Sequence, residues 1–260
     1  MTSASVTRPR FTGRTALVTG GGSGLGRATA RAFAAEGANV VVAGRTAAPL
    51  EETVALIEAA GGTALAVTAD VSRSADLAAL VAATVDRFGS LDVAVNNAGV
   101  LRAGRPLAEL SEADWRTMLD INVTGVLLAL QAEVGQMRTQ ATGGTIVNIG
   151  SNLGAHHTVP GTAAYGATKA AVSALSRAAA AEHIRDGVRI NTVSPGASDT
   201  SMSLRPGESE ADRAARMKEE SPLGRVSTTG EVAAAVLYLA SDESAPVVGA
   251  DLVIDGGAAA

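Results

Sequence analysis

Short apolar runs alternate along the chain with longer segments in which apolar residues recur at helical spacing. Several runs are apolar at consecutive positions, as NVVVA at 39–43 is, and this is typical of strands buried on both faces. Glycines follow the ends of three expected helices, where a left-handed residue often terminates a helix. The expected strands are 15–19, 39–43, 63–68, 91–95, 145–149, 188–193 and 251–254, and the expected helices are 25–36, 47–60, 74–88, 112–137, 162–185 and 229–240.

This alternation predicts the α/β class, in the form of a doubly wound, seven-stranded parallel sheet with helices on both faces. We expect residues 1–10 to be a flexible lead-in and residues 11–260 to form a single domain. The polar region 198–225 interrupts the alternation and contains a charged helical piece at 208–220. Ligands bind beyond the carboxyl ends of such strands, so this lid-like insertion either covers a ligand or is a surface excursion without function.

Composition narrows the classes of function. The chain has no cysteine, which excludes disulfides, thiolate metal ligands and a cysteine nucleophile together. Three histidines are too few for a usual histidine zinc site, so we expect no metal. The net charge of −5 and the scarcity of aromatic residues argue against a nucleic-acid surface. We find neither a secretory signal nor a run of about 20 apolar residues, and we therefore expect a cytoplasmic protein that does not span a membrane.

A glycine-rich turn, TGGGSGLG at 19–26, joins the first expected strand to the first expected helix. Glycines let the backbone approach a pyrophosphate closely, and the helix N-terminus offers it unpaired N–H groups and a partial positive charge. The spacing is Gly20-x-x-x-Gly24-x-Gly26 and not a strict GxGxxG. Such a turn alone can be only a flexible loop, but the strand before it and the helix after it favour a Rossmann-type dinucleotide-binding site.

The end of the second expected strand indicates which dinucleotide is bound. An NAD enzyme usually places Asp or Glu there to bind the ribose hydroxyls, but this strand is followed by Gly44 and Arg45. Gly44 removes a carboxylate that would repel a 2′-phosphate, and the guanidinium of Arg45 binds phosphate oxygens well. We therefore expect NADP(H), with NAD(H) as the alternative if Arg45 is only a solvated residue that opens the next helix.

Tyr165 and Lys169 lie four residues apart in an expected helix, and hence on one face of it. Acid–base chemistry near neutrality requires that the tyrosine phenolate be stabilised, because the ordinary pKa of tyrosine is about 10. A neighbouring ammonium favours the phenolate. We therefore expect Lys169, together with the positive nicotinamide of an oxidised cofactor, to lower the pKa of Tyr165 to roughly 7–8.

Together these motifs resemble those of the short-chain dehydrogenase/reductase family, in its subfamily with TGxxxGxG, NNAG and YxxxK motifs. They occur in the family's order from about residue 11 to residue 257, and they are specific for fold and cofactor but not for substrate. The matching segments are TGGGSGLG at 19–26, Asp70-Val71, NNAG at 96–99, DINVTG around Asn122, NIGSNLG around Ser151, Tyr165 with Lys169, Pro195-Gly196 and the closing VIDGG.

The resemblance implies a catalytic set of four residues. Tyr165 would exchange a proton with the substrate oxygen, and Lys169 would hold the nicotinamide ribose and assist Tyr165. Ser151 would donate a hydrogen bond that positions the carbonyl, and Asn122 would help to hold a water in the proton path. The residues that it implies for the cofactor, from the phosphates through the adenosine to the nicotinamide, are Gly20, Ser23, Gly24, Leu25, Gly26, Arg45, Asp70, Val71, Asn96, Ala98, Gly99, Tyr165, Lys169, Pro195, Gly196 and Thr200.

The loop before Tyr165 leaves two alternatives open. The stretch from Ser151 to Tyr165 is one residue longer than in many relatives, so that Asn152 could take the place of Ser151. His156 and His157 fall in the same loop, and they either face the substrate or are solvated loop residues.

The function implied is NADP(H)-dependent transfer of a hydride between nicotinamide and a small-molecule carbonyl or secondary alcohol. The alternatives are an NAD-dependent alcohol dehydrogenase of the same family and a non-catalytic cofactor-sensing protein, which would commonly lack the tyrosine or the lysine. The resemblance also implies a homotetramer, assembled through the helices at 112–137 and 162–185 and through the helix at 229–240 with the C-terminal strand. Specificity is expected to lie in region 198–225 and loop 152–164, which point to no particular substrate.

Overall fold

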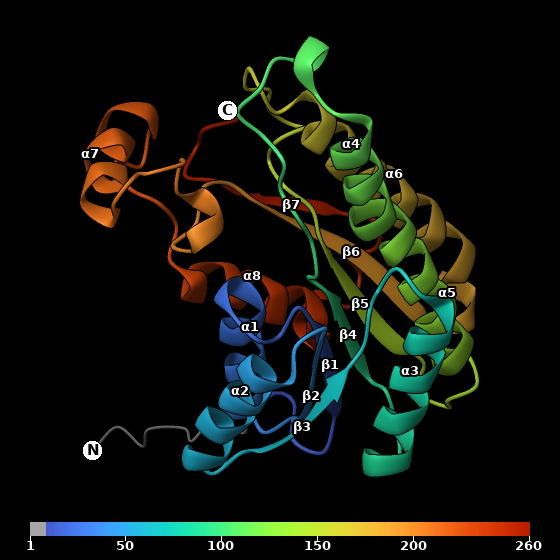
Figure 1. Ribbon diagram of the computed structural model, residues 1–260. Coiled ribbons are helices and arrows are strands. Elements are labelled where there is room, and N and C mark those ends of the chain that lie inside the picture. The colour runs from blue at the N-terminus through green and yellow to red at the C-terminus, as the bar shows by residue number, and fades with distance from the viewer. Residues whose placement is uncertain (1–8) are drawn as a thin grey trace.

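The computed structural model describes residues 9–260 and contains a seven-stranded sheet whose neighbouring strands are all parallel (Figure 1). The strand order is β3-β2-β1-β4-β5-β6-β7, so the chain builds one half of the sheet outward from β1 and then the other half outward from β4. The prediction of a doubly wound α/β fold is confirmed. The strands are β1 (Thr15–Thr19), β2 (Asn39–Gly44), β3 (Thr63–Thr68), β4 (Val93–Asn96), β5 (Gly144–Ile149), β6 (Val188–Pro195) and β7 (Asp251–Ile254).

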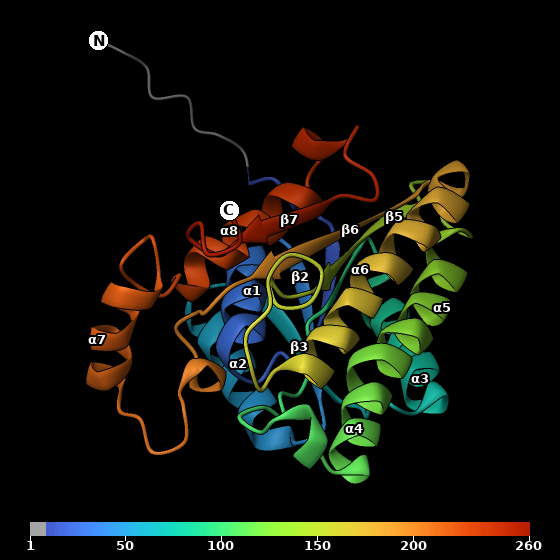
Figure 2. The ribbon, with the colours of Figure 1, turned by 90° about the horizontal axis from the view of Figure 1, so that it is seen from above.

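Helices cover both faces of the sheet, as Figures 1 and 2 show. This follows from the right-handed crossover that joins each strand to the next parallel strand. One face carries α1 (Gly24–Ala35), α2 (Ala47–Ala59) and α8 (Thr229–Ala240), the other carries α3 (Ser74–Phe88), α4 (Glu112–Leu119), α5 (Gly125–Met137) and α6 (Ala163–His183), and α7 (Glu210–Glu220) stands away from the sheet.

The sheet divides the core into two apolar layers. Successive residues of a strand point to opposite faces, so Ala16 and Val18 of β1 pack in the layer under α1, and Leu17 packs in the layer under α5. All three side chains are at most 1% exposed. Burial on both faces explains why the sequence shows consecutive apolar positions in these strands instead of alternation.

One expected helix has a different local geometry. The segment 112–137 is helical throughout, but a π-helical turn, Asp120–Thr124, joins α4 to α5. Such turns hold one extra residue and occur frequently at functional sites. By length and composition alone this combined helix could cross a membrane, yet core helices pass the same test, and 44% of its most apolar window is buried inside the fold.

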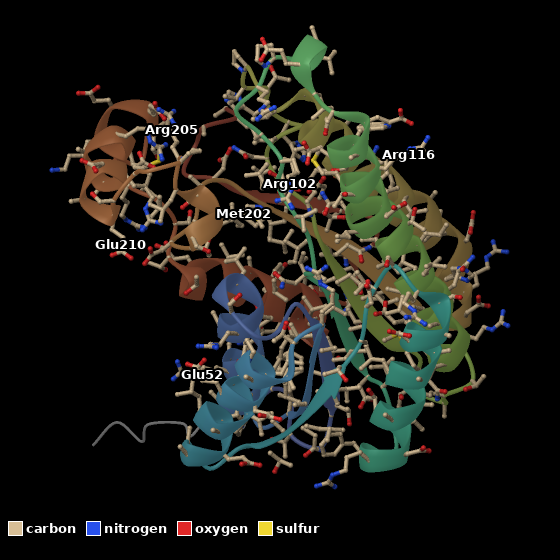
Figure 3. All side chains as sticks on the ribbon, viewed as in Figure 1. Glu52, Arg102, Arg116, Met202, Arg205 and Glu210 are labelled. Carbon is tan, nitrogen blue, oxygen red and sulfur yellow. The ribbon has the colours of Figure 1, made fainter. Side chains whose placement is uncertain are left out.

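The sequence predicts two regions, 1–10 and 198–225, that lie outside the regular alternation of strands and helices. Most of the expected lead-in at 1–10 lies outside the described residues, although Arg10 forms an ion pair with Glu36 at 3.1 Å. Region 198–225 contains α7, and Figure 3 shows its Met202 nearer to the sheet than Arg205 and Glu210. Buried Arg213 of α7 donates hydrogen bonds to the carbonyl oxygen of Thr200, which holds the start of this region against the helix.

Candidate active site

The carboxyl ends of β1 and β4 meet where the strand order reverses, which is the position at which open α/β sheets bind ligands. The hydroxyl oxygen of Thr19 accepts hydrogen bonds from the N–H groups of Asn97 at 3.0 Å and Ala98 at 3.1 Å. In return, the side-chain amide of Asn97 donates to the carbonyl oxygen of Thr19 at 2.9 Å. These bonds lock the two strand ends together and fix Ala98 beside the glycine turn, and Asn97 and Thr19 were not among the predicted site residues.

The glycine turn between β1 and α1 fits a pyrophosphate group. A Cβ on Gly26 would overlap the carbonyl oxygen of Gly20, so the turn can only close with glycine at position 26. Ser23 is the N-cap of α1, but its side chain makes no capping hydrogen bond and the first turn has no acidic side chain. The N–H groups of Leu25 and Gly26 therefore remain for an anion, at the end of the helix where the dipole favours negative charge.

Neighbouring elements brace this turn. The hydroxyl group of Thr53 on α2 donates to the carbonyl oxygen of Gly21 at 3.0 Å, and the guanidinium of Arg27 donates to that of Gly22 at 2.5 Å. Thr200, from the start of region 198–225, lies across the turn, since a Cβ on Gly24 would be 3.2 Å from its methyl group. The structure thus brings Thr200 to the glycine turn.

Arg45 and Asp70 follow two adjacent strands, β2 and β3. The N–H of Ala69 donates to the carbonyl oxygen of Gly44 at 2.9 Å, so these two strand ends lie side by side. Arg45 is exposed there. The pKa of Asp70 is lowered because the carboxylate accepts hydrogen bonds from the hydroxyl and N–H groups of Ser72, with a smaller contribution from the charge of Arg45. This end of the cleft therefore offers one oriented carboxylate and one exposed guanidinium.

The four predicted catalytic residues are all buried near one another. Tyr165 and Lys169 are on α6, and Ser151, two residues after the end of β5, makes a side-chain hydrogen bond with Tyr165. The ammonium of Lys169 donates to the carbonyl oxygen of Ile149 at 2.8 Å and lies 5.9 Å from the centre of the Tyr165 ring. The structure thus places Ser151, Tyr165 and Lys169 together, at the carboxyl end of β5.

Asn122 joins this group through the π-helical turn. Its side chain accepts a hydrogen bond from the N–H of Val100 at 2.8 Å and donates to the carbonyl oxygen of Val100 at 2.9 Å. A Cβ on Gly99 would lie 3.3 Å from Oδ1 of Asn122 and 3.6 Å from Nζ of Lys169. Gly99 therefore leaves room beside both the Asn122 carbonyl and the Lys169 ammonium, and Asn122 reaches this place from the π-helical turn.

Burial dominates the electrostatics of the pair Tyr165 and Lys169 on α6. Burial raises the pKa of Tyr165 to about 12, and its hydrogen bond with Ser151 offsets this only in part. Burial also lowers the pKa of Lys169 to about 8. Burial is thus the largest influence on the pKa of Tyr165 among the protein's own groups, and the expected lowering by Lys169 together with a positively charged nicotinamide stays a prediction.

The loop before α6 places Asn152 and His156, two of the residues left open by the sequence. The side-chain amide of Asn152 donates to the carboxylate of Asp255 at 3.2 Å, whereas Ser151 contacts Tyr165, so Asn152 does not take the place of the serine. Nε2 of His156 lies 2.9 Å from Oδ2 of Asp251 on β7, and its side chain is 25% exposed. His156 therefore ties the loop to the sheet edge and is not a solvated loop residue. Within residues 9–260, no group of three or more His, Asp or Glu side chains is placed to hold a metal ion.

Asn96 lies in the interior, beside a buried acid that the sequence analysis did not single out. Its side-chain amide donates to Oε2 of Glu133 on α5 and to Oδ1 of Asn148 on β5, both at 2.9 Å. Its carboxamide thus points into the core and not toward the expected adenosine side, because it is on the α5 side of β4. Burial raises the pKa of Glu133 to about 7. The available signal was a glutamate among buried apolar positions of a helix, next to Val134.

The Glu133→Gln variant is expected to become more stable relative to the parent as the pH rises. The folded parent holds Glu133 protonated up to about pH 7, while the unfolded chain ionises it near its ordinary value of 4.5. The contribution of this group is thus present below about pH 4.5 and is lost as the pH rises toward about 7. Between about pH 5 and pH 8, the difference in free energy of unfolding should shift by roughly 1–3 kcal/mol in favour of the variant.

Urea unfolding of both proteins at the two pH values measures this shift. The exposed Glu109→Gln variant controls for the loss of a carboxylate, and its difference from the parent should be the same at both pH values. A Glu133→Gln difference that is also independent of pH would show that Glu133 is ionised in the folded protein.

The fold and the grouped residues define a nicotinamide-type dinucleotide-binding oxidoreductase, and comparison with known proteins supports this class. A family model described as enoyl-(acyl carrier protein) reductase matches residues 20–259. The chain is 41% identical over 247 residues to 2,5-dichloro-2,5-cyclohexadiene-1,4-diol dehydrogenase of Sphingobium indicum, covering 95% of this chain and 97% of that protein. Cis-4-hydroxycyclohexanecarboxylate dehydrogenase of Sinomonas cyclohexanicum is also 41% identical, with the same coverage of both chains.

Solved structures agree with this result. The crystal structure of a putative short-chain alcohol dehydrogenase from Sinorhizobium meliloti superposes with a TM-score of 0.89 at 35% identity, over 96% of this chain and 98% of that chain. The chain belongs to the short-chain dehydrogenase/reductase family, whose members use a nicotinamide cofactor. It is an oxidoreductase of the kind that acts on CH–OH groups.

Proposed function

We propose that the protein is an NADP(H)-dependent oxidoreductase that interconverts a ketone and a secondary alcohol on a six-membered ring. The two relatives named above are named for hydroxylated six-membered rings, which supports this substrate class. The observation that carries the proposal is the buried contact of Ser151 with Tyr165, beside Lys169 and within the same crevice as the glycine turn. We propose further that the protein is a cytoplasmic homotetramer, as the family resemblance implies.

The residues of the crevice fit a dinucleotide along its length. The N–H groups of Ser23, Leu25 and Gly26 would bind the pyrophosphate, and Arg45 would bind the 2′-phosphate. When bound, the cofactor supplies the hydride in its reduced form and a positive ring in its oxidised form. Asp70 and Val71 would contact the adenine, and Ala98 and Gly99 would contact the adenosine side of the cofactor. The residues that would contact the nicotinamide end are Pro195, Gly196 and Thr200.

Tyr165 would deliver the proton in the reduction of a ketone. Its raised pKa of about 12 keeps the hydroxyl group protonated near neutral pH, which is the form that a proton donor needs. Ser151 would donate a hydrogen bond to the same carbonyl oxygen and stabilise the negative charge that develops on it. Lys169 would replace the proton on Tyr165 through solvent, and Asn122 would orient that path. In alcohol oxidation the same hydroxyl group must first lose its proton, so a higher pH favours that direction.

The test is a screen of cyclic ketones with the purified protein, in which nicotinamide absorbance is followed with NADPH and with NADH. The proposal predicts ketone-dependent oxidation of NADPH at a higher kcat/KM than that of NADH. Turnover with NADH at the higher kcat/KM would contradict the cofactor assignment and support the NAD-dependent alternative. Binding of a dinucleotide without turnover of any ketone or alcohol would instead support a cofactor-sensing protein.

A further inference from the structure

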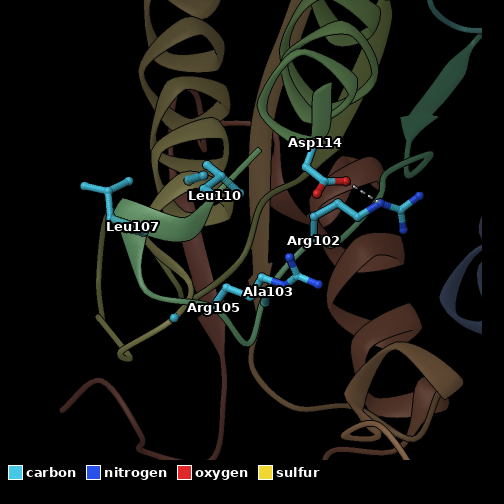
Figure 4. A pocket seen from close by; sticks show the side chains of 9 residues that line it. Arg102, Ala103, Arg105, Leu107, Leu110 and Asp114 are labelled. Atoms are coloured by element: carbon cyan, nitrogen blue, oxygen red, sulfur yellow. Dashed lines mark ion pairs between the residues drawn. The ribbon is translucent and has the colours of Figure 1, made fainter. Parts of the chain in front are cut away.

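A pocket of about 200 Å³ opens beside the proposed catalytic residues, between the segment after β4 and the start of α6 (Figure 4). Ala163 and Ala164 line one wall of this pocket, and Tyr165 follows them directly in α6. Leu110 lines another part of the pocket and packs in the same apolar cluster as Tyr165. The pocket therefore lies beside the first turn of α6, which carries the proposed proton donor.

Backbone contacts fix the shape of this pocket. The N–H of Gly104 donates to the carbonyl oxygen of Gly161 at 3.0 Å. Both glycines have positive φ angles, 93° and 80°, and a Cβ on Gly161 would lie 3.4 Å from the Cα of Gly104. This close approach holds the segment 102–105 against the start of α6, so the pocket is part of the fold and needs no ligand to form.

Three charged side chains line the pocket, Arg102, Arg105 and Asp114. Oδ1 of Asp114 lies 3.4 Å from Nε of Arg102, while its Oδ2 accepts a hydrogen bond from the hydroxyl group of Ser111 (Figure 4). This contact engages Nε of Arg102 and leaves the two terminal nitrogens of its guanidinium available to a ligand. Arg105 makes no ion pair with any residue in the part of the chain that the structure describes. The lining therefore carries an excess of one positive charge.

The rest of the lining is apolar. Leu107 and Leu110 stand on one side, and Leu107 is 68% exposed, so its apolar surface is accessible to a ligand. A guanidinium is planar and matches a carboxylate with two parallel hydrogen bonds. Leucines next to arginines suit a ligand that carries an aliphatic ring at one end and an anionic group at the other.

We propose that Arg105, assisted by Arg102, binds a carboxylate on the substrate, so that the preferred substrates are cyclic hydroxy acids and the corresponding keto acids. This inference rests on the proposed function, because it places the ring of the substrate between Tyr165 and this pocket. The carboxylate of Asp114 competes with the carboxylate of the substrate for Arg102 and therefore weakens substrate binding.

The test uses a matched pair of ketones, 4-oxocyclohexanecarboxylate and its methyl ester, with NADPH. The two have the same ring and ketone and differ in the negative charge. The parent protein is expected to reduce the acid with a kcat/KM about tenfold higher than the ester, since charged hydrogen bonds in a partly exposed pocket give about this factor.

Four variants test whether a preference for the acid over the ester comes from a carboxylate site in this pocket. Arg105→Ala and Arg102→Ala should each lower kcat/KM for the acid severalfold, the former more strongly, and leave the ester within about twofold of the parent. Asp114→Asn keeps the bond with Ser111 and removes the competing charge, so it should raise kcat/KM for the acid. Arg116→Ala is the matched control, because this arginine is on α4 but pairs with Glu112 and does not line the pocket.

A binding measurement is independent of turnover. Trp115 is the one tryptophan of the chain, and it follows Asp114 and packs against the cluster that contains Tyr165. Titration with cyclohexanecarboxylate, with and without NADP⁺, should change its fluorescence in the parent and in Arg116→Ala. The change should require a much higher concentration in Arg105→Ala.

The outcomes for this site and for the proposed function are distinguishable. Equal kcat/KM for acid and ester in the parent, or a parallel loss for both in Arg105→Ala, would overturn the carboxylate site while leaving the oxidoreductase intact. If neither ketone is reduced with either dinucleotide, the proposed function fails. The fluorescence titration then still decides the site, because the same midpoint in the parent and in Arg105→Ala would overturn it.

Discussion

The Tyr165→Phe variant is expected to reduce its ketone about a thousandfold more slowly than the parent, with little change in affinity for the dinucleotide. The substitution removes one hydroxyl group, which is the proposed proton donor beside Ser151. The ring remains, so the apolar contacts of Tyr165 with Ala164 and Met118 persist. The loss should therefore be seen in kcat with saturating NADPH, and dinucleotide binding followed by fluorescence should stay within a few-fold of the parent.

Tyr238→Phe is the matched control for this variant. It is the same substitution at the second tyrosine of the chain, which is 41% exposed on α8, and its kcat should equal that of the parent. If Tyr165→Phe and Tyr238→Phe both retained the parent's kcat, the proton would have to come from another group. The proposed role of Tyr165 would then be wrong.

The Arg45→Asp variant is expected to lose about a hundredfold or more in kcat/KM for NADPH and to change little with NADH. Removing the guanidinium abolishes charged hydrogen bonds to the 2′-phosphate, which are each worth about 1.5–3 kcal/mol. The new carboxylate then repels the same phosphate and can instead accept hydrogen bonds from the ribose hydroxyls of NADH. Steady-state rates with varied NADPH or NADH at a fixed ketone concentration measure both effects.

Arg87→Asp makes the same change of charge at a distant place. Arg87 is in the last turn of α3, at the opposite edge of the sheet from the carboxyl ends of the strands, and its guanidinium stacks on Phe88. This control should leave the ratio of the two kcat/KM values unchanged. An unchanged ratio in Arg45→Asp as well would mean that Arg45 is only a solvated residue, and it would favour NAD(H).

The fold was predictable because burial leaves a local record in the sequence. Strands β1 and β2 are covered on both faces, so the middle residues of each strand are consecutive apolar residues, and the glycines at the helix ends have the positive φ angles expected of C-terminal caps. Gly37 and Gly89 are examples, at 85° and 86°. The order of the strands then follows from the handedness of parallel crossovers.

Those parts of the site that depend on one short segment were also predictable. The glycine turn needs only its own residues and the helix that follows it, and Tyr165 and Lys169 share a helix face because they are four residues apart. The π-helical turn around Asn122 was not predictable, since no residue type marks the extra residue. The structure shows its consequence, which is a pair of hydrogen bonds between Asn122 and Val100.

Contacts between distant segments account for the remaining features of the site that could not be predicted from the sequence. Asn97 binds Thr19 across a separation of 78 residues, and His156 reaches Asp251 across 95 residues. Nothing near these residues in the sequence indicates their partners. The raised pKa of Tyr165 has the same origin, because it reflects how deeply the folded protein buries the phenol and not the spacing of the YxxxK motif.

Transfer of deuterium from the cofactor tests the central claim most directly. NADPH that carries deuterium at the transferable position of its nicotinamide ring is mixed with the protein and the best ketone from the screen, and the alcohol product is analysed by mass spectrometry. The account predicts one deuterium, bound to the carbinol carbon and not exchanged with solvent. An alcohol without deuterium at that carbon would contradict direct hydride transfer between nicotinamide and substrate in this crevice.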